Sequence, residues 1–146
     1  MIDVGEKRTT KREALAKGKV LLSGRTIELI KQGKIPKGDV LDCARVAAVL
    51  AAKKTPELIP MCHPLRITHS KIDFDLGKNE IEIKVEVRAV DRTGVEMEAL
   101  TAVAVAALTV YDMCKGVDKT TEISYIRLMK KTGGRSGDFV RKEGVE

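Results

Sequence analysis

One long alanine-rich stretch, residues 94–115, constrains the fold more than any other segment. It contains no proline and no internal glycine, and alanine and leucine dominate it, so it predicts a helix. Thr93 and Glu96 match a capping box at its start. The thirteen residues 99–111 carry no charge, so the helix is either buried on all sides or spans a membrane. Thirteen residues are too few to cross a bilayer, and we therefore expect a core helix.

A carboxylate near the end of this helix is unusual. Asp112 lies in the last turn, where the helix dipole disfavours negative charge, and Lys115 follows three residues later on the same face. The pair is either a solvated ion pair of little energetic value or part of a functional site. Its neighbours Met113 and Cys114 are apolar, which favours partial burial.

Length and cysteine content indicate one cytoplasmic domain. A chain of 146 residues is long enough for one sizeable core, so we expect a single domain over residues 1–146. No apolar segment follows the N-terminus, and nothing there marks the chain for secretion. Cys43, Cys62 and Cys114 are odd in number and widely spaced, which argues against a disulfide framework and for a reducing compartment.

The positive charge limits the class of partner. A net charge of +6 indicates an anionic partner, which is nucleic acid, a membrane surface or a phosphorylated small molecule. Two tyrosines and two phenylalanines offer little surface for stacking bases, and no lysine-faced helix with bulky apolar anchors suggests a membrane. A polyphosphate ligand is the remaining interpretation.

The pattern along the rest of the chain predicts an α+β fold. Apolar residues alternate in 70–76 and 80–90 around a turn, which predicts a hairpin with one wet and one buried face. Asp39 is placed to cap a second alanine-rich helix. Strands followed by crossing helices predict an antiparallel sheet with helices packed on one face. The other expected segments are a basic N-terminal arm at about 1–18, a short strand at 19–22, helices at 24–33 and 40–54, a strand at 123–129 and a glycine-rich basic tail at about 130–146.

Three loop segments carry side chains with two open interpretations. The apolar loop 58–65, stiffened by two prolines, presents His63, which is either a buried, hydrogen-bonded histidine or a site residue. Cys62 and His63 would supply only half of a metal site, and no second pair at ligand spacing occurs in the sequence. Lys37 is either a solvated loop lysine or a functional cation. The loop 130–137 is either a floppy tail or a backbone cradle for phosphate.

Five motifs stand in order along the chain: KGDV at 37–40, LIPMCHPL at 58–65, TGVEMEALTAV at 93–103, LTVYDMCK at 108–115 and KTGGRSGDF at 131–139. Together they resemble the MoaC-type family of cyclic pyranopterin monophosphate synthases, enzymes of molybdenum cofactor biosynthesis. The resemblance covers residues 3–139. Met61, Val110 and Arg135 depart from the most common residues of the motifs but keep their chemical character.

This resemblance implies a ferredoxin-like α+β fold and a homo-hexamer, a trimer of dimers, with active sites between subunits. It implies a lyase that converts 3′,8-cyclo-7,8-dihydro-GTP to cyclic pyranopterin monophosphate and releases diphosphate. Asp112 and Lys115 are the implied catalytic pair, and Lys37 and His63 are their catalytic partners. The implied substrate-binding residues are Met61, Cys62, His63, Met97 and Glu98, with Arg12 and Lys131 as basic contacts. We add Glu96 to them, although its capping-box position explains it without a function.

The implied chemistry needs proton transfer and cations for phosphate, but no electron transfer. Neither a redox cofactor nor a metal is required in principle, although magnesium can accompany the triphosphate. We expect Lys37 and Lys115 to transfer protons while Asp112 polarises one of them. Lys131, Arg12 and the glycine-rich tail would hold the triphosphate.

The spacing within the long helix predicts that a site is shared between chains. Glu98 and Asp112 are fourteen residues apart, which places them on nearly the same face but about 21 Å apart along the axis. A ligand of nucleotide size does not comfortably reach both in one subunit. If both belong to active sites, opposite helix ends from two subunits must converge.

Two other classes of function compete with this interpretation. A basic nucleic-acid-binding module with a ferredoxin-like sheet would need aromatic residues on the open face, where Glu80, Glu82 and Glu86 provide acidic charge instead. An oligomeric binding protein without catalysis would hold the nucleotide and leave it unchanged.

Overall fold

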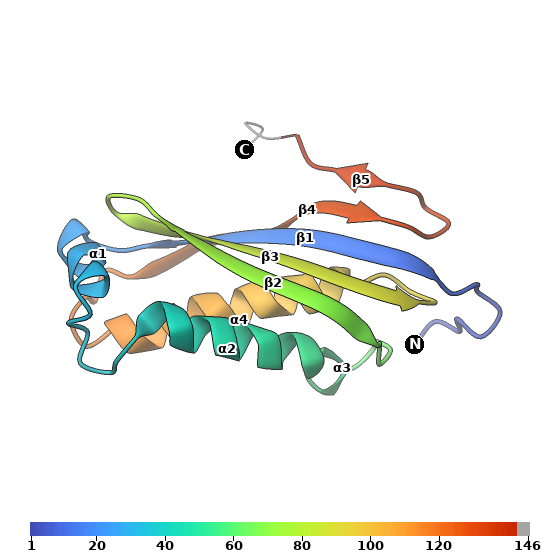
Figure 1. Ribbon diagram of the computed structural model, residues 1–146, viewed down its shortest axis with the longest axis horizontal. Coiled ribbons are helices and arrows are strands. Elements are labelled where there is room, and N and C mark those ends of the chain that lie inside the picture. The colour runs from blue at the N-terminus through green and yellow to red at the C-terminus, as the bar shows by residue number, and fades with distance from the viewer. Residues whose placement is uncertain (143–146) are drawn as a thin grey trace.

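Within residues 1–142, which the computed structural model describes, the chain forms a five-stranded antiparallel sheet with helices on one face (Figure 1). This arrangement confirms the predicted α+β, ferredoxin-like class. The elements are β1 Thr10–Leu21, α1 Gly24–Lys31, α2 Val40–Lys53, α3 Thr55–Leu58, β2 Ile67–Leu76, β3 Glu80–Asp91, α4 Glu96–Cys114, β4 Glu122–Thr132 and β5 Phe139–Val140. The strand order is β2-β3-β1-β4-β5, and α2 and α4 lie side by side beneath the sheet.

The long helix α4 is the predicted core helix. Ala99, Ala102 and Val103 are completely buried between the sheet and α2. Two positions contradict burial on all sides, because Leu108 and Tyr111 are 57% and 38% exposed in the single chain. By length and composition α4 could cross a membrane, but here it packs against the sheet and α2 and forms part of the core.

The central strand β1 is the main difference from the sequence prediction. The sequence predicts a basic arm over residues 1–18, yet residues 10–18 belong to a strand that pairs with β3 on one side and β4 on the other. Ala14 and Ala16 face the helices and are completely buried. Gly18 lies so close to α4 that an added Cβ would meet Val103 Cγ1 at 2.5 Å. Small residues therefore form the part of the sheet where α4 approaches most closely.

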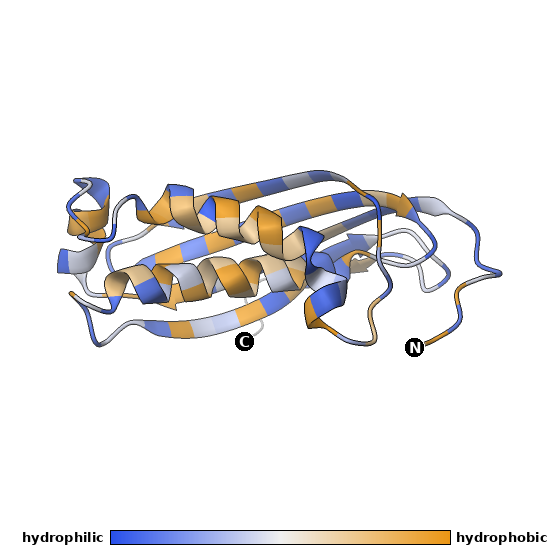
Figure 2. Cartoon of the chain, turned by 90° about the horizontal axis from the view of Figure 1, so that it is seen from below, coloured by the Kyte–Doolittle hydropathy of each residue, from blue (hydrophilic) through white to orange (hydrophobic). Residues whose placement is uncertain are grey.

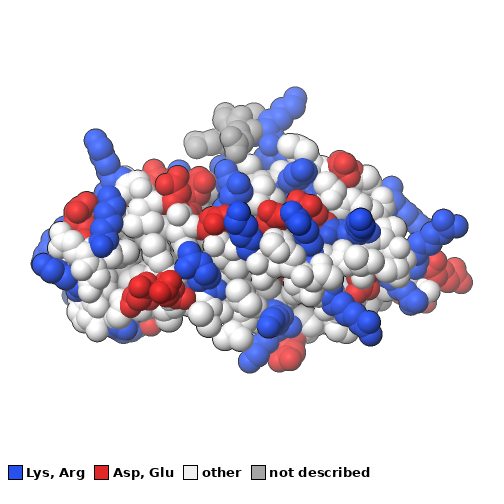
Figure 3. Space-filling model, in the orientation of Figure 1, with Lys and Arg blue, Asp and Glu red and all other residues white. Residues whose placement is uncertain are grey.

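The predicted hairpin is confirmed as β2 and β3, with one apolar and one charged face. Ile83 and Val85 of β3 are completely buried against the helices, as the alternating colours along the strands in Figure 2 illustrate. On the other face Lys19 pairs with Glu80, with Nζ and Oε2 2.9 Å apart. Lysine and arginine are interspersed with acidic residues on the side of the molecule in Figure 3 and do not form a single basic stripe.

Helix starts follow the sequence in one case and differ in another. Asp39 caps α2 as predicted, because its side chain accepts a hydrogen bond from Asp42 N at 3.0 Å. The capping box at α4 was wrong. The N-cap residue is Val95, whose side chain has no polar atom that could cap the helix. Glu96 forms an ion pair with Lys131 instead.

Candidate active site

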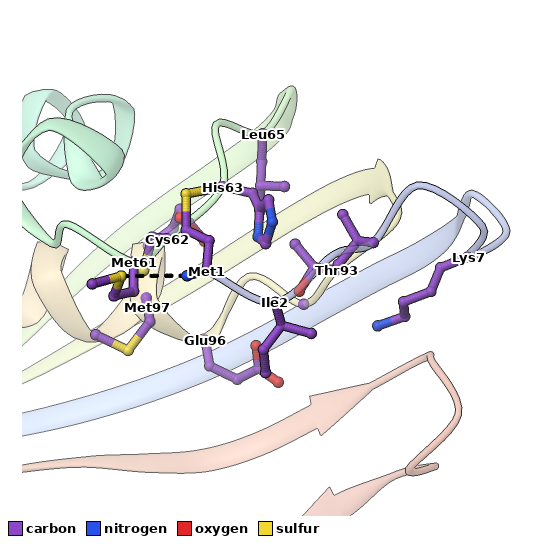
Figure 4. A pocket seen from close by; sticks show the side chains of 13 residues that line it. Met1, Ile2, Lys7, Met61, Cys62, His63, Leu65, Thr93, Glu96 and Met97 are labelled. Carbon is purple, nitrogen blue, oxygen red and sulfur yellow. Dashed lines mark hydrogen bonds between the residues drawn. The ribbon is translucent and has the colours of Figure 1, made fainter.

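A cavity of about 500 Å³ opens at the N-terminal end of α4 (Figure 4). The loop after α3 is stiffened by Pro60 and Pro64, and it faces the first turn of α4 across this cavity. Two segments 30 residues apart in sequence thus form one pocket. Six of the predicted substrate-binding residues line it: Met61, Cys62, His63, Glu96, Met97 and Glu98.

Glu98 is the buried acid of this pocket. Only 3% of the residue is exposed, and burial, with further contributions from Glu96 and Asp91, raises the pKa of its carboxyl to about 7. Burial and the nearby Glu98 carboxyl also raise the pKa of the Cys62 thiol, which keeps that sulfur protonated and poorly nucleophilic. The pocket can therefore hold a proton on Glu98 near neutral pH.

The N-terminal residues before β1 form another wall of the pocket. Met1, Ile2 and Lys7 line it, and the Met1 amine lies 3.5 Å from the sulfur of Met61. Figure 4 shows Lys7 at the opposite end of the view from Met61 and Met97. The sequence predicted a basic arm here, and in the structure its first residues, Met1 to Lys7, lie along the pocket.

Lys131 lies at the rim, where it pairs with Glu96. Its Nζ is 2.9 Å from Glu96 Oε1, and it also donates to Ser136 Oγ at 3.2 Å. Both charged side chains are about one quarter exposed, so solvent screens this pair less than a surface pair. Glu96 therefore positions a cation next to the pocket that it also lines, and its predicted contact with substrate stays a prediction.

Arg12 lies in a second, basic cleft of about 360 Å³. It is 6% exposed and donates from Nε to Asp91 O at 3.3 Å. Gly134, with φ +87°, packs against the Arg12 guanidinium, where a Cβ would clash. The glycine-rich loop is thus folded around an arginine. The cleft is lined by Glu6, Lys7, Arg8, Thr10, Arg12, Gly134 and Arg135.

Lys7 and Arg8 line the basic cleft but were not among the residues predicted from the sequence. Lys7 lines both the pocket and the basic cleft, so the two cavities meet at this side chain. The available signal was the density of basic residues in the first twelve positions, but charge alone does not show which way an arm folds.

The other predicted catalytic residues gather at the C-terminal end of α4. Lys37 Nζ donates to Asp112 Oδ2 at 3.0 Å and to the Asp112 carbonyl oxygen at 3.1 Å. Lys115 Nζ lies 3.3 Å from Asp112 Oδ1. The hydrogen bonds from Lys37 and then Lys115 lower the pKa of the Asp112 carboxyl. A carboxylate between two ammonium groups is suited to holding one lysine while another exchanges a proton.

These three side chains are open to solvent in the single chain. They are between 48% and 58% exposed, so the expectation of partial burial was wrong for the isolated chain. Met113 and Cys114 are buried, but they point into the core on the other side of the helix. The apolar side chains of Met113 and Cys114 therefore indicate that the inner face of the helix is buried, and they say nothing about the burial of Asp112.

The two groups of residues lie at opposite ends of α4. His63 lines the pocket at the start of the helix, whereas Lys37, Asp112 and Lys115 surround its end. The helix is continuous over its nineteen residues, so Glu98 and Asp112 are separated by about 21 Å along its axis. One chain therefore does not bring all predicted site residues together.

Within residues 1–142, no three His, Cys, Asp or Glu side chains are arranged to hold a metal ion. The pairing of Cys62 with His63 gains no third ligand. That the reaction needs no metal stays a prediction.

Comparison with known proteins identifies the family. A family model described as the MoaC family matches residues 1–134. A cyclic pyranopterin monophosphate synthase of Chloroflexus aurantiacus is 57% identical over 143 residues, which cover 97% of this chain and 88% of the relative. Proteins of the same name from Desulfitobacterium hafniense and Clostridium perfringens are 56% and 58% identical; the matches cover 100% and 95% of this chain, and 90% and 89% of the relatives. The chain belongs to the MoaC family.

Proposed function

We propose that this protein is a cyclic pyranopterin monophosphate synthase, a lyase of molybdenum cofactor biosynthesis. Its substrate is 3′,8-cyclo-7,8-dihydro-GTP, and its products are cyclic pyranopterin monophosphate and diphosphate. One observation carries the proposal: six residues predicted to bind this substrate, from two distant segments, line one cavity. The names of the relatives agree with it.

The pocket and the basic cleft suit the two halves of the substrate. The ring system enters the pocket, where Met61 and Met97 offer apolar surface and Glu98 offers a buried carboxyl. The triphosphate extends past Lys7 into the cleft beside Arg12, which supplies charge for the phosphates. This orientation places the charged leaving group among the cations.

The chemistry opens a fused ring of the substrate and rebuilds it as a pterin, with several proton transfers, and it includes one substitution at phosphorus. A hydroxyl oxygen of the substrate forms a bond to the α-phosphorus, the bond to the bridging oxygen breaks, and diphosphate leaves. Lys37 and Lys115 exchange protons with the rearranging ring and the hydroxyl, and Asp112 holds them in place. His63 assists from the pocket. The lysines and Arg12 stabilise the diphosphate, and magnesium is optional.

A second copy of the chain completes the site. Met97, Leu108, Tyr111 and Lys115 form an exposed stripe along one face of α4. If two copies pack this stripe antiparallel about a two-fold axis, Lys115 of one copy lies beside Met97 of the other. The apolar area of Leu108 and Tyr111 is then covered, and the exposed Asp112 lies near a pocket. Three such pairs form the expected hexamer.

The rival function as a nucleic-acid-binding module gains little support. On the open face of the sheet, Lys17 and Lys19 are neutralised by Glu82 and Glu80. Tyr125 is an aromatic ring on this face, and Lys19 and Arg127 already lie over it.

We also propose that the enzyme works in the cytoplasm, since Cys43, Cys62 and Cys114 are free thiols.

Direct turnover tests the proposal. The purified protein is incubated with the cyclic dihydro-GTP substrate, and diphosphate and pterin products are quantified with and without magnesium chelation. We expect both products from the wild type and large losses for Lys115→Ala and Asp112→Asn with substrate binding retained. Binding without product would favour the non-catalytic alternative, and retention of RNA without turnover would favour the nucleic-acid module.

A further inference from the structure

A buried carboxylate next to the end of α4 ties together two distant parts of the chain. Asp118 is 6% exposed and accepts four hydrogen bonds. Its Oδ2 accepts from Ser23 N and from Thr26 Oγ1, both at 2.8 Å. Its Oδ1 accepts from the backbone N of Thr120 at 2.9 Å and from the Thr120 hydroxyl. The start of α1 is thereby fixed to the turn that follows α4.

This connection is built around the ionised form of Asp118. Burial alone would raise the pKa of the Asp118 carboxyl, but the hydrogen bonds from Thr120, Ser23 and Thr26 outweigh it and hold the pKa well below its ordinary range. Hydrogen bonds to an ionised acceptor are stronger than neutral ones. Donors point at both carboxylate oxygens of Asp118. If an amide replaced the carboxylate, its NH2 group would lie against at least one of these donors and no hydrogen bond would form there.

The connection leads directly to the loop that carries Lys37. Ser23 caps α1, and α1 ends in a turn at Gly33, where φ is +67°. Ile35 then inserts into the core with 4% exposure, and Lys37 follows two residues later. The loop is held from both sides, by Asp118 through α1 and by the buried Ile35.

The ion pair at the end of α4 does not hold this loop by itself. Lys37 and Asp112 are 48% and 57% exposed, and exposed ion pairs contribute little to stability. Asp118 lies three residues after Lys115, and its backbone N donates to Cys114 O at 2.9 Å. The same residue is therefore anchored to the segment that carries Asp112 and Lys115.

We propose that Asp118 is a positioning residue that sets the distance between Lys37 and the Asp112–Lys115 pair. It fixes the loop before α2 against the end of α4, so that both lysines meet the same carboxylate. Its role in turnover rests on the proposed function, whereas its control of the Lys37–Asp112 geometry does not.

Three substitutions test this role. Asp118→Asn keeps the size of the side chain but places an amide donor against the donors of Ser23, Thr26 or Thr120. Thr26→Val removes one donor at nearly constant volume, and Thr26→Ser keeps the hydroxyl. We expect Asp118→Asn to reduce kcat about ten- to a hundredfold, because small misplacements of catalytic groups have effects of this size. Thr26→Val should give a smaller loss and Thr26→Ser almost none.

Two readouts separate positioning from loss of stability. The ring system of the substrate binds in the pocket, whose lining includes none of Lys37, Asp112 and Lys115, so KM should stay within about twofold in all three variants. The pKa of Asp112, followed by NMR of its carboxyl carbon, should rise in Asp118→Asn and Thr26→Val, because Lys37 no longer reaches it. Ile72→Val serves as the control, since it weakens the core in β2 away from both ends of α4.

The proposal is wrong if Asp118→Asn and Thr26→Val lower the unfolding temperature but leave kcat and the pKa of Asp112 like those of Ile72→Val. It is equally wrong if only KM changes. If Asp118→Asn does not fold, the comparison of Thr26→Val with Thr26→Ser decides. If the wild type does not turn over the substrate, the proposed function fails, and the pKa of Asp112 still tests the positioning role.

Discussion

Replacing Glu98 with glutamine should stabilise the protein at alkaline pH and leave its stability almost unchanged at acid pH. The folded state raises the pKa of this carboxyl from 4.5 to about 7, mainly by burial. Below pH 4.5 the group is protonated in the folded and unfolded chains, so it has no effect. Between pH 4.5 and 7 only the unfolded chain loses the proton, and stability falls as pH rises. Above pH 7 the full penalty is present.

The size of the effect follows from the two pKa values. Their difference corresponds to about 3 kcal/mol at most, and water in the open pocket reduces this to about 2 kcal/mol. Glutamine has almost the same shape and no charge, so Glu98→Gln avoids the penalty. For a chain of this length we expect the unfolding temperature to rise by about 6 °C at pH 8 relative to wild type, and by about 1.5 °C at pH 5, where about a quarter of the penalty is already present.

The assay is urea unfolding and thermal unfolding at pH 5 and pH 8, at one protein concentration because assembly shifts both. Glu57→Gln is the matched control, since Glu57 is exposed on α3. An equal stability difference at both pH values would refute the reasoning, as would a wild-type stability that does not fall between pH 5 and pH 8. The stabilised variant should bind substrate more weakly, because the carboxyl is part of the pocket.

Two further substitutions test the fold and the site. Gly18→Ala should destabilise the protein by about 1–3 kcal/mol in urea unfolding, because the new methyl group meets Val103; a neutral effect would show that α4 can move away from β1. Lys37→Met should raise the pKa of Asp112 towards its ordinary value in an NMR titration, since the largest contribution to its lowering comes from Lys37; an unchanged pKa would mean that this hydrogen bond does not form in solution.

The elements with local signals were predictable from the sequence. Asp39 as an N-cap marked α2, and the alternation on both sides of residues 77–79 marked the hairpin of β2 and β3. The helix α4 followed from its composition. In each case the residues that determine the element are neighbours along the chain.

The central strand β1 could not be predicted from the sequence, because its residues are determined by packing against α4 in the folded protein. Its inner face carries alanine and glycine, which have low strand propensity, because α4 leaves no room for larger side chains there. Gly18 is explained by its neighbours in the fold, because an added Cβ would meet Val103 Cγ1 at 2.5 Å and the Tyr125 carbonyl oxygen at 3.2 Å. The capping box failed in a similar way: Thr93 and Glu96 fit the local pattern, but the ion pair of Glu96 with Lys131 arises between segments 35 residues apart.

The sequence predicted which residues belong to the two ends of α4, but not how they are arranged in space. The resemblance supplied His63, Glu98 and Asp112, and helix spacing alone placed Glu98 far from Asp112. The arm that brings Lys7 to the pocket has no periodic pattern that could locate it. The sequence did not single out Asp118, because its partner Thr26 lies 92 residues away.

The claim that one active site is built from two copies is tested most directly by mixing two inactive variants. His63→Ala removes the catalytic histidine of the pocket, and Lys115→Ala disables the other end of α4. In a randomly mixed two-fold pair, half of the pairs are hybrids, and each hybrid contains one site with both residues intact, so activity should return to about one quarter of the wild-type value. If the co-refolded mixture stays as inactive as either variant alone, the site does not combine opposite helix ends from two chains.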